Sequence, residues 1–125
     1  MIEAAHTLAD ENHMPLVLVL GEMLELGDEA EKAHRQLGRQ AAIARPTYVF
    51  WKGEQGAAVR SGLEDQGFGG EIYPVGGGQE FSLLLEELQP KGCVALFKGS
   101  RGNHLERLVE VFREFILPAG DSHVV

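Results

Sequence analysis

The sequence predicts an α/β fold in which helices cover both faces of a mainly parallel, doubly wound sheet. Short apolar runs at 16–20, 46–51, 71–75 and 93–97 alternate with longer segments of helical periodicity, which is the pattern of repeated βαβ units. The run at 16–20 is aliphatic at every position, as expected for a parallel strand that is buried on both sides. A loop containing glycine follows each run. The predicted arrangement is therefore Rossmann-like.

The expected strand order comes from the handedness of the crossovers. Right-handed connections and the commonest doubly wound topology predict the order 3-2-1-4. This order puts the third strand at an edge, which suits Pro74 because proline has no N–H for a ladder hydrogen bond. It also makes the first and fourth strands neighbours where the winding reverses, and ligands bind outside the carboxyl ends of strands at that point. We therefore expect the loops 21–27 and 98–103 to meet.

Each predicted helix is recognised by its apolar face or its cap. The first helix spans residues 2–11. The second begins at Asp28, whose spacing to Glu31 resembles a capping box, and it presents a face of small residues. A third helix ends near residue 66, and a fourth follows the glycines at 76–78. The last helix carries apolar residues at helical spacing, namely Leu105, Leu108, Val109, Phe112, Phe115 and Ile116.

Size and composition limit the possible functions. The 125 residues suit one domain, which we place at residues 1–117, with a flexible tail over 118–125. The net charge of −8 argues against nucleic acid or an anionic membrane as a partner. No apolar run is long enough to cross a bilayer, and the N-terminus is unlike a signal peptide. The single cysteine, Cys93, lies in a predicted buried strand and permits no internal disulfide. These features favour a cytoplasmic protein.

The loop 98–103 is the most distinctive polar segment of the chain. It combines two glycines, two cations and a hydroxyl: Gly99, Gly102, Lys98, Arg101 and Ser100. Between a strand and a helix, such a loop presents backbone N–H groups to an anion, and its glycines let a ligand approach closely. An ordinary βα turn with solvated charges fits the spacing equally well. The expected meeting with the loop 21–27 favours the anion site.

The loop 21–27 carries two carboxylates, Glu22 and Glu25. They could act as a base or as Mg²⁺ ligands, although two loop carboxylates are more often simply solvated. We interpret His34, in the following helix, as a packed and hydrogen-bonded histidine. The sequence lacks G-x-x-x-x-G-K-[ST], lacks G-x-G-x-x-G after the first strand, and has no metal-ligand spacing among its histidines. The chain therefore looks like one wall of a site, and we assign no catalytic residue and no metal ligand.

These same segments resemble a known protein family. The motifs are Gly21-Glu22-Met23-Leu24-Glu25-Leu26-Gly27, then His34 and Gly38, then Phe97-Lys98-Gly99-Ser100-Arg101-Gly102 followed by Leu105-Glu106. Together they look like the C-terminal domain of the Mur ligases, over about residues 1–116, and Lys52-Gly53-Glu54 also fits. Two residues depart from the family pattern: Glu22 stands where the family usually has Asp, and Asn103 stands where it often has Met.

The resemblance implies that the chain is part of a larger enzyme. Mur ligases have one domain for the UDP-sugar, a central ATPase domain, and a last domain that binds the incoming amino acid or dipeptide. The resemblance is greatest to the type that adds D-alanyl-D-alanine to UDP-N-acetylmuramoyl-tripeptide through an acyl phosphate, in peptidoglycan precursor synthesis. ATP and Mg²⁺ would then be bound mainly by the central domain, and the isolated domain would not catalyse.

The resemblance also implies functions for the two loops. Substrate binding is expected at Lys98, Gly99, Ser100, Arg101 and Asn103. The ATP side of an interdomain cleft is expected at Glu22, Glu25, Gly27 and His34. The residues alone leave two alternatives open: a free-standing small-anion or nucleotide-binding α/β module, and a structural or interaction domain whose loops are incidental.

Overall fold

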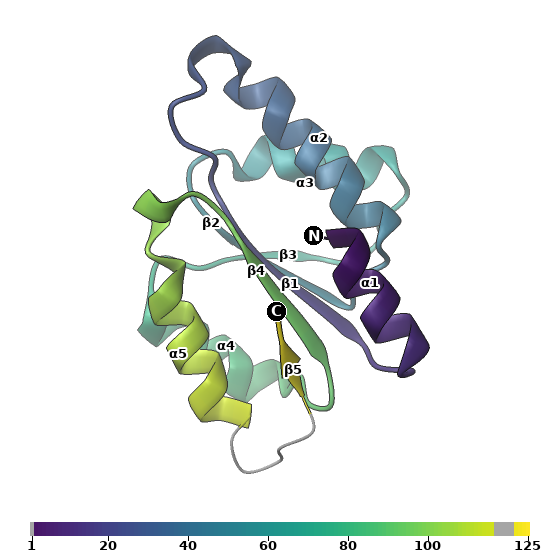
Figure 1. The fold of residues 1–125 in the computed structure, drawn as a ribbon. Coiled ribbons are helices and arrows are strands. Elements are labelled where there is room, and N and C mark those ends of the chain that lie inside the picture. Colours follow the sequence, from purple (N-terminus) through teal and green to yellow (C-terminus); the bar gives the residue numbers. More distant parts are fainter. Residues whose placement is uncertain (1, 117–121) are drawn as a thin grey trace.

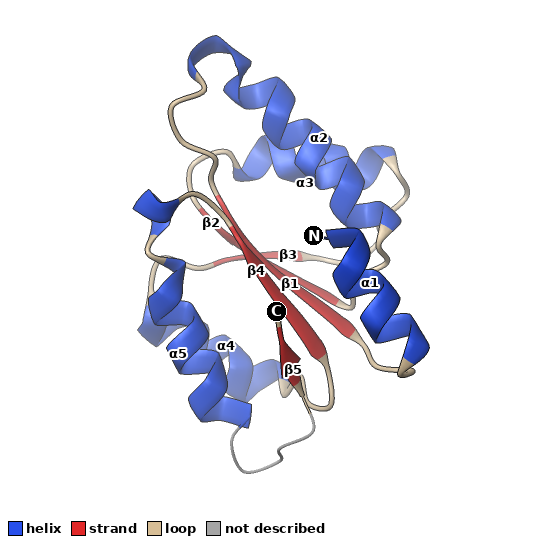
Figure 2. Cartoon of the chain, viewed as in Figure 1, coloured by secondary structure: helices blue, strands red, loops and turns tan. Residues whose placement is uncertain are grey.

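A parallel sheet of five strands, in the order β3-β2-β1-β4-β5, forms the centre of the computed structural model (Figure 1). The structure describes residues 2–116 and 122–125, with Arg101 described in its main chain only. The strands are β1 Leu16–Gly21, β2 Tyr48–Lys52, β3 Ile72–Pro74, β4 Val94–Lys98 and β5 His123–Val124. The α-helices are α1 Ile2–Glu11, α2 Ala30–Ile43, α3 Gly56–Asp65, α4 Gly78–Leu88 and α5 Leu105–Ile116. Two short 3-10 helices, η1 Gly27–Glu29 and η2 Arg101–Asn103, precede α2 and α5 (Figure 2).

The first four strands have the order that the sequence predicts. β1 pairs in parallel with β2 on one side and with β4 on the other, so the doubly wound α/β fold is confirmed. β3 lies at one edge, with Pro74 opposite Trp51. The N–H of Val75, one residue beyond the proline, donates to the carbonyl oxygen of Trp51 over 2.8 Å. The carboxyl ends of β1 and β4 are therefore adjacent, as the predicted site requires.

The fifth strand is a correction to the sequence analysis, which predicts four strands and assigns residues 118–125 to a flexible tail. β5 pairs in parallel with β4, and the N–H of His123 donates to the carbonyl oxygen of Cys93 over 2.8 Å. Two residues are too few to show a periodic pattern, so only the tertiary pairing reveals this strand. The rest of the expected tail, residues 118–121, lies outside the described residues.

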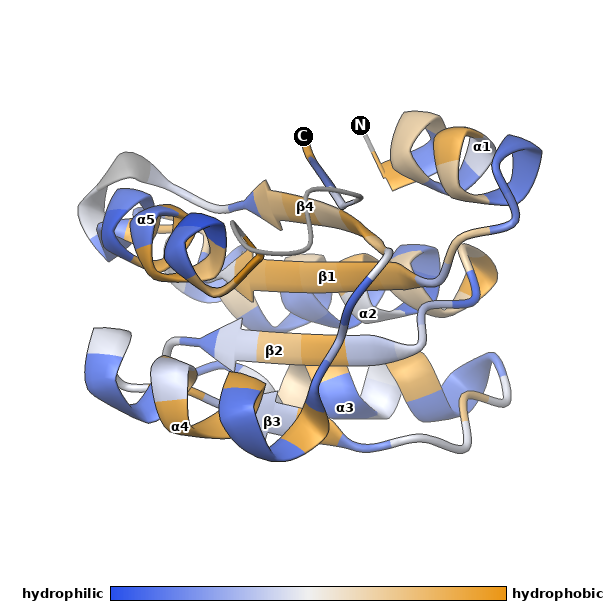
Figure 3. Cartoon of the chain, turned by 90° about the horizontal axis from the view of Figure 1, so that it is seen from below, coloured by the Kyte–Doolittle hydropathy of each residue, from blue (hydrophilic) through white to orange (hydrophobic). Residues whose placement is uncertain are grey.

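Each face of the sheet has its own hydrophobic core. Helices α1, α2 and α3 cover one face, where the core includes Leu18 and Trp51, and α4 and α5 cover the other, where the core includes Val19 and Phe112 (Figure 1). Alternate residues of β1 supply the two cores, and residues 17–20 have no exposed surface. This double burial explains the unbroken aliphatic run, and Figure 3 shows β1 as hydrophobic along its length.

The start of α2 differs from the predicted capping box. Residues 27–29 form the 3-10 helix η1, and α2 begins at Ala30. Asp28 therefore lies inside the 3-10 turn, and the N-cap residue of α2, Glu29, makes no side-chain capping hydrogen bond. The turn begins with Gly27 at a φ of 56°, a conformation that favours glycine. The spacing of Asp28 and Glu31 is a local pattern, so it could not predict that the backbone before α2 forms a 3-10 turn.

Helices α2 and α3 cross at two glycines. A Cβ atom on Gly38 would overlap the carbonyl oxygen of Val59, and a Cβ atom on Gly62 would overlap the carbonyl oxygen of Arg35. The two helix backbones therefore lie closer together than any side chain at these positions would permit. Because the obstructing atoms belong to the backbone, no rotamer change can relieve the overlap.

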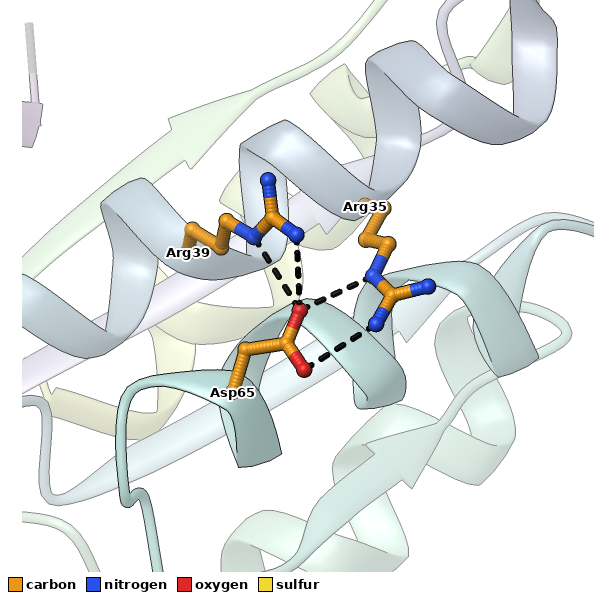
Figure 4. A network of polar contacts seen from close by, with 3 residues as sticks. All are labelled: Arg35, Arg39 and Asp65. Carbon is orange, nitrogen blue, oxygen red and sulfur yellow. Dashed lines mark hydrogen bonds and ion pairs between the residues drawn. The ribbon is translucent and has the colours of Figure 1, made fainter.

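An ion network links the same two helices at the surface (Figure 4). Asp65 accepts hydrogen bonds from Nε of Arg35 over 2.8 Å and from Nε of Arg39 over 3.0 Å. The hydrogen bond from Arg35 lowers the pKa of the Asp65 carboxyl below its ordinary value, and the bond from Arg39 adds to this effect against the opposing cost of desolvation. Since the Asp65 side chain is 29% exposed, water and salt weaken both pairs.

We predict that Gly62→Ala destabilises the chain by about 1–3 kcal/mol. The steric overlap of the new methyl group with the backbone of α2 outweighs the stabilisation from the higher helix propensity of alanine. Urea denaturation followed by circular dichroism measures this difference. Gly69→Ala is the matched control, because Gly69 has no atom within 4 Å of an added Cβ. A Gly62→Ala protein as stable as the Gly69→Ala protein would show that the two helices do not cross at these glycines.

We predict that the Asp65 network stabilises the fold only above the titration range of its carboxyl. A folded-state pKa below the unfolded value of about 3.8 means that the stabilisation is fully present above the unfolded pKa, and is lost as the pH falls through the folded pKa. The urea midpoints of the wild type and Asp65→Asn should therefore differ at neutral pH and converge below about pH 4. The exposed Asp10→Asn should follow the wild type throughout. A difference that persists undiminished at low pH would contradict a role for the Asp65 charge.

Candidate functional site

The candidate site lies at the carboxyl ends of β1 and β4, where the loops that follow them come into contact. Gly21 ends β1, and Gly99 follows β4. A Cβ atom on Gly99 would lie 2.9 Å from Cα of Gly21 and 3.1 Å from its nitrogen. Such distances are too short for a side chain, so this approach of the two backbones requires glycine at position 99.

Ser100 joins the two loops through both its main chain and its side chain. Its N–H donates to the carbonyl oxygen of Glu22 over 3.4 Å, and its Oγ accepts from the N–H of Leu24 over 3.0 Å. One residue of the loop after β4 thus holds two residues of the loop after β1. The predicted meeting of the loops 21–27 and 98–103 is confirmed.

Asn103 adds a second link between the loops from a buried position, since only 8% of its surface is exposed. Its Nδ2 donates to the carbonyl oxygen of Glu22, the same oxygen that Ser100 contacts. The amide also packs against Gly21, where an added Cβ would lie 3.0 Å from Nδ2. The side chain of Asn103 is therefore directed at the loop after β1.

The loop after β2 joins the same network. Lys52, the last residue of β2, donates from Nζ to the main-chain oxygen of Asn103. The carboxylate of Glu22 reaches the same loop, where Oε1 accepts from the N–H of Glu54 over 2.6 Å and of Gln55 over 2.9 Å. Glu22 thus contacts neighbouring loops with both its carbonyl oxygen and its carboxylate, and the expectation of a simply solvated carboxylate is wrong for this residue.

His34 connects the site to the core beneath it. The side chain is fully buried, with Nε2 2.9 Å from the nitrogen of Met23 and Nδ1 2.6 Å from the oxygen of Ala30. Because the N–H of Met23 can only donate, Nε2 is the acceptor, and Nδ1 carries the proton that it donates to Ala30. The ring also meets Trp51 edge-on, with 5.6 Å between centroids. The interpretation of His34 as a packed, hydrogen-bonded residue is confirmed.

A small cavity opens between the two loops. Its volume is about 190 Å³, and it is lined by Gly21, Met23, Leu37, Lys98, Gly99 and Ser100. Lys98 is only partly buried, and within the described part of the chain its ammonium has neither an ion pair nor a side-chain hydrogen bond. The hydroxyl of Ser100 accepts from Leu24 and so keeps its own proton for a further acceptor. The cavity therefore offers a cation and a hydrogen-bond donor to a small anion.

Two further residues of the predicted site, Glu25 and Gly27, do not line the cavity. Glu25 and Gly27 are exposed, and both have positive φ, at 63° and 56°. Leu24, which precedes Glu25 in the chain, is 40% exposed. The prediction for Arg101 concerns a side chain outside the described part of the structure. Among the residues that are described, no group of His, Cys, Asp and Glu is arranged to hold a metal ion, and no helix is both long and apolar enough to span a bilayer.

The structure thus brings together most of the residues that the sequence singles out, and it adds others. Lys98, Gly99 and Ser100 line the cavity itself. The sequence analysis did not predict that Met23 and Leu37 line the cavity, and it gave no function to Lys52. Met23 lies within the distinctive segment 21–27, whereas Leu37 has the pattern of an ordinary core leucine. The link from Lys52 to Asn103 joins residues 51 positions apart, and no local signal indicates it.

Comparison with known proteins bears out the resemblance that the motifs indicate. No protein-family model matches the chain. In sequence, the chain is 32% identical over 100 residues to the UDP-N-acetylmuramoyl-tripeptide–D-alanyl-D-alanine ligase of Bacillus subtilis (strain 168), a match that covers 80% of the chain and 22% of that ligase. In structure, it is similar to a crystal structure of MurF from Acinetobacter baumannii, with a TM-score of 0.69 and 25% identity over 90% of the chain and 25% of MurF. The chain thus spans about a quarter of the length of these proteins, and its resemblance to this type of Mur ligase is confirmed in sequence and in fold.

Proposed function

We propose that this chain is the C-terminal domain of an ATP-dependent Mur ligase that adds D-alanyl-D-alanine to UDP-N-acetylmuramoyl-tripeptide in cytoplasmic peptidoglycan precursor synthesis. The similarity in sequence and fold to ligases of this type supports the proposal. The observation that carries it is Lys98, which lines a cavity at the switch point between β1 and β4.

The cavity supplies what the carboxylate of the incoming dipeptide needs. Lys98 provides a positive charge, and Ser100 provides a hydroxyl proton that its contact with Leu24 leaves available. A carboxylate held at both groups fixes one end of the dipeptide. The amine at the other end is then restricted in position, and restricting a nucleophile in this way contributes to catalysis.

ATP and Mg²⁺, when bound, supply the activation of the tripeptide carboxylate. Two observations favour their binding mainly outside this chain: the described residues form no metal-ligand group, and the Glu22 carboxylate already accepts from Glu54 and Gln55. We expect Glu25 and Gly27, which are exposed, to face the nucleotide side of a cleft. We therefore expect the 125-residue chain alone to bind but not to catalyse.

A second candidate function is a free-standing module that binds a small anion in the same cavity. It is favoured by Lys98 and Ser100, which both line the cavity and offer a cation and a hydroxyl to any small anion. The two functions differ in the step after binding, because only the ligase couples the dipeptide to ATP consumption.

We predict that the protein encoded by the reading frame containing this chain releases ADP only when both the tripeptide precursor and D-alanyl-D-alanine are present. In that protein, Lys98→Met should lower kcat/KM for the dipeptide about ten- to a hundredfold, because a hydrogen bond to a charged group contributes roughly 1.5–3 kcal/mol. A coupled ADP-release assay at varied dipeptide and varied ATP measures both constants.

Lys91→Met is the matched control, because Lys91 lies at the opposite end of β4, where its ammonium sits 6.0 Å from the ring centroid of Phe115. Its kinetics should match those of the wild type. A wild-type protein without dipeptide-dependent ADP release would contradict the ligase and favour the anion-binding module. If Lys98→Met lowers kcat/KM for ATP alone, the cavity binds the nucleotide rather than the dipeptide.

A further inference from the structure

Three loops of the candidate site are linked through one buried residue, Asn103. Asn103 donates from Nδ2 to the carbonyl oxygen of Glu22, and its own main-chain oxygen accepts from Nζ of Lys52. Glu22 in turn binds the loop after β2 through its carboxylate. Among the residues that the structure describes, Asn103 and His34 are the two polar side chains that are buried. A buried polar group with this many partners fixes the relative positions of the segments that it joins.

The position of this network relates it directly to the cavity. Asn103 packs against Gly21, and its N–H donates to the carbonyl oxygen of Ser100 over 3.0 Å. Gly21 and Ser100 both line the cavity, one from each loop. Asn103 itself does not line it. The separation of the two cavity walls therefore depends on a side chain that lies behind them.

We propose that Asn103 and Lys52 are positioning residues, which keep the cavity between Gly21 and Ser100 preformed for the carboxylate of the incoming peptide. This inference rests on the proposed ligase function and deepens it, since it replaces a substrate contact at Asn103 with an indirect one. Without the amide, the carbonyl oxygen of Glu22 loses one of its two donors, while the loop after β1 keeps its contacts with Ser100, with the loop after β2 and with His34. In the unbound protein, the distance between the two loops would then vary more widely. Binding would be weaker, because it would have to order the loops.

The test separates the positioning of the loops from the stability of the fold. Asn103→Ala should speed hydrogen exchange at the amides of Leu24 and Ser100 about tenfold in the 125-residue chain, as expected for losing one hydrogen bond. In the longer protein it should raise KM for D-alanyl-D-alanine about tenfold. The value of kcat at saturating dipeptide and KM for ATP should stay near those of the wild type, because Asn103 does not line the cavity.

Lys52 supplies the second variant. Lys52→Met removes the link to Asn103 while leaving the buried amide in place, so it decides the matter if Asn103→Ala does not fold. Lys52→Arg keeps a cationic donor of similar reach and should restore KM for the dipeptide. His104→Asn is the matched control, because His104 is an exposed neighbour at a φ of 53°, a conformation that asparagine tolerates.

Faster exchange with an unchanged KM for the dipeptide would overturn the proposal, because the network would then only stabilise the fold. Equal rises in KM for the dipeptide and for ATP would overturn it as well, as would unchanged exchange at both amides. A wild-type protein without dipeptide-dependent activity would instead overturn the proposed function itself. That failure is distinguishable, because it is seen before any substitution is made.

Discussion

The approach of two backbones at Gly21 and Gly99 is the constraint on which the site depends. Parallel pairing of β1 with β4 brings the two chain segments to the same edge of the sheet, but pairing alone does not let the following loops touch. Because neither residue has a side chain, Gly99 comes so near Gly21 that an added Cβ would lie 2.9 Å from its Cα. Only at that separation can Ser100 reach both Glu22 and Leu24. The topology selects the place, and the glycines make the contact possible.

The core beneath the site holds these loops in turn. His34 accepts from the N–H of Met23 and donates to Ala30 in α2, and its ring rests against Trp51 of β2. The position of α2 is itself fixed by its backbone contact with α3 at Gly38 and Gly62. A displacement of α2 would therefore be transmitted through His34 to the cavity wall at Met23. The two hydrophobic cores and the loop network form one continuous support for a cavity of about 190 Å³.

How much the sequence could predict depends on how local the signal is. The aliphatic run at 16–20 indicates a buried strand, and Pro74 indicates a strand at the edge of the sheet. Both signals are local, and the observed order of the first four strands agrees with them. Asp28 resembles an N-cap residue because of its spacing to Glu31, which is a local pattern. The 3-10 turn, which moves the start of α2 beyond Asp28, begins at Gly27 in the preceding loop. β5 has two residues and no pattern of its own. Asn103 has polar loop neighbours, which give no sign of burial, and its burial comes from contacts with residues about 50 and 80 positions away.

A preformed binding site at the ends of β1 and β4 is tested most directly by NMR titration of the 125-residue chain with D-alanyl-D-alanine. Millimolar binding is enough for such a titration to locate the contact. The amides of Gly21, Met23, Gly99 and Ser100 should shift together and with one dissociation constant, since they line the same cavity. Shifts confined to surfaces away from these loops, or no shifts at millimolar dipeptide, would contradict the assignment of the cavity to the peptide carboxylate.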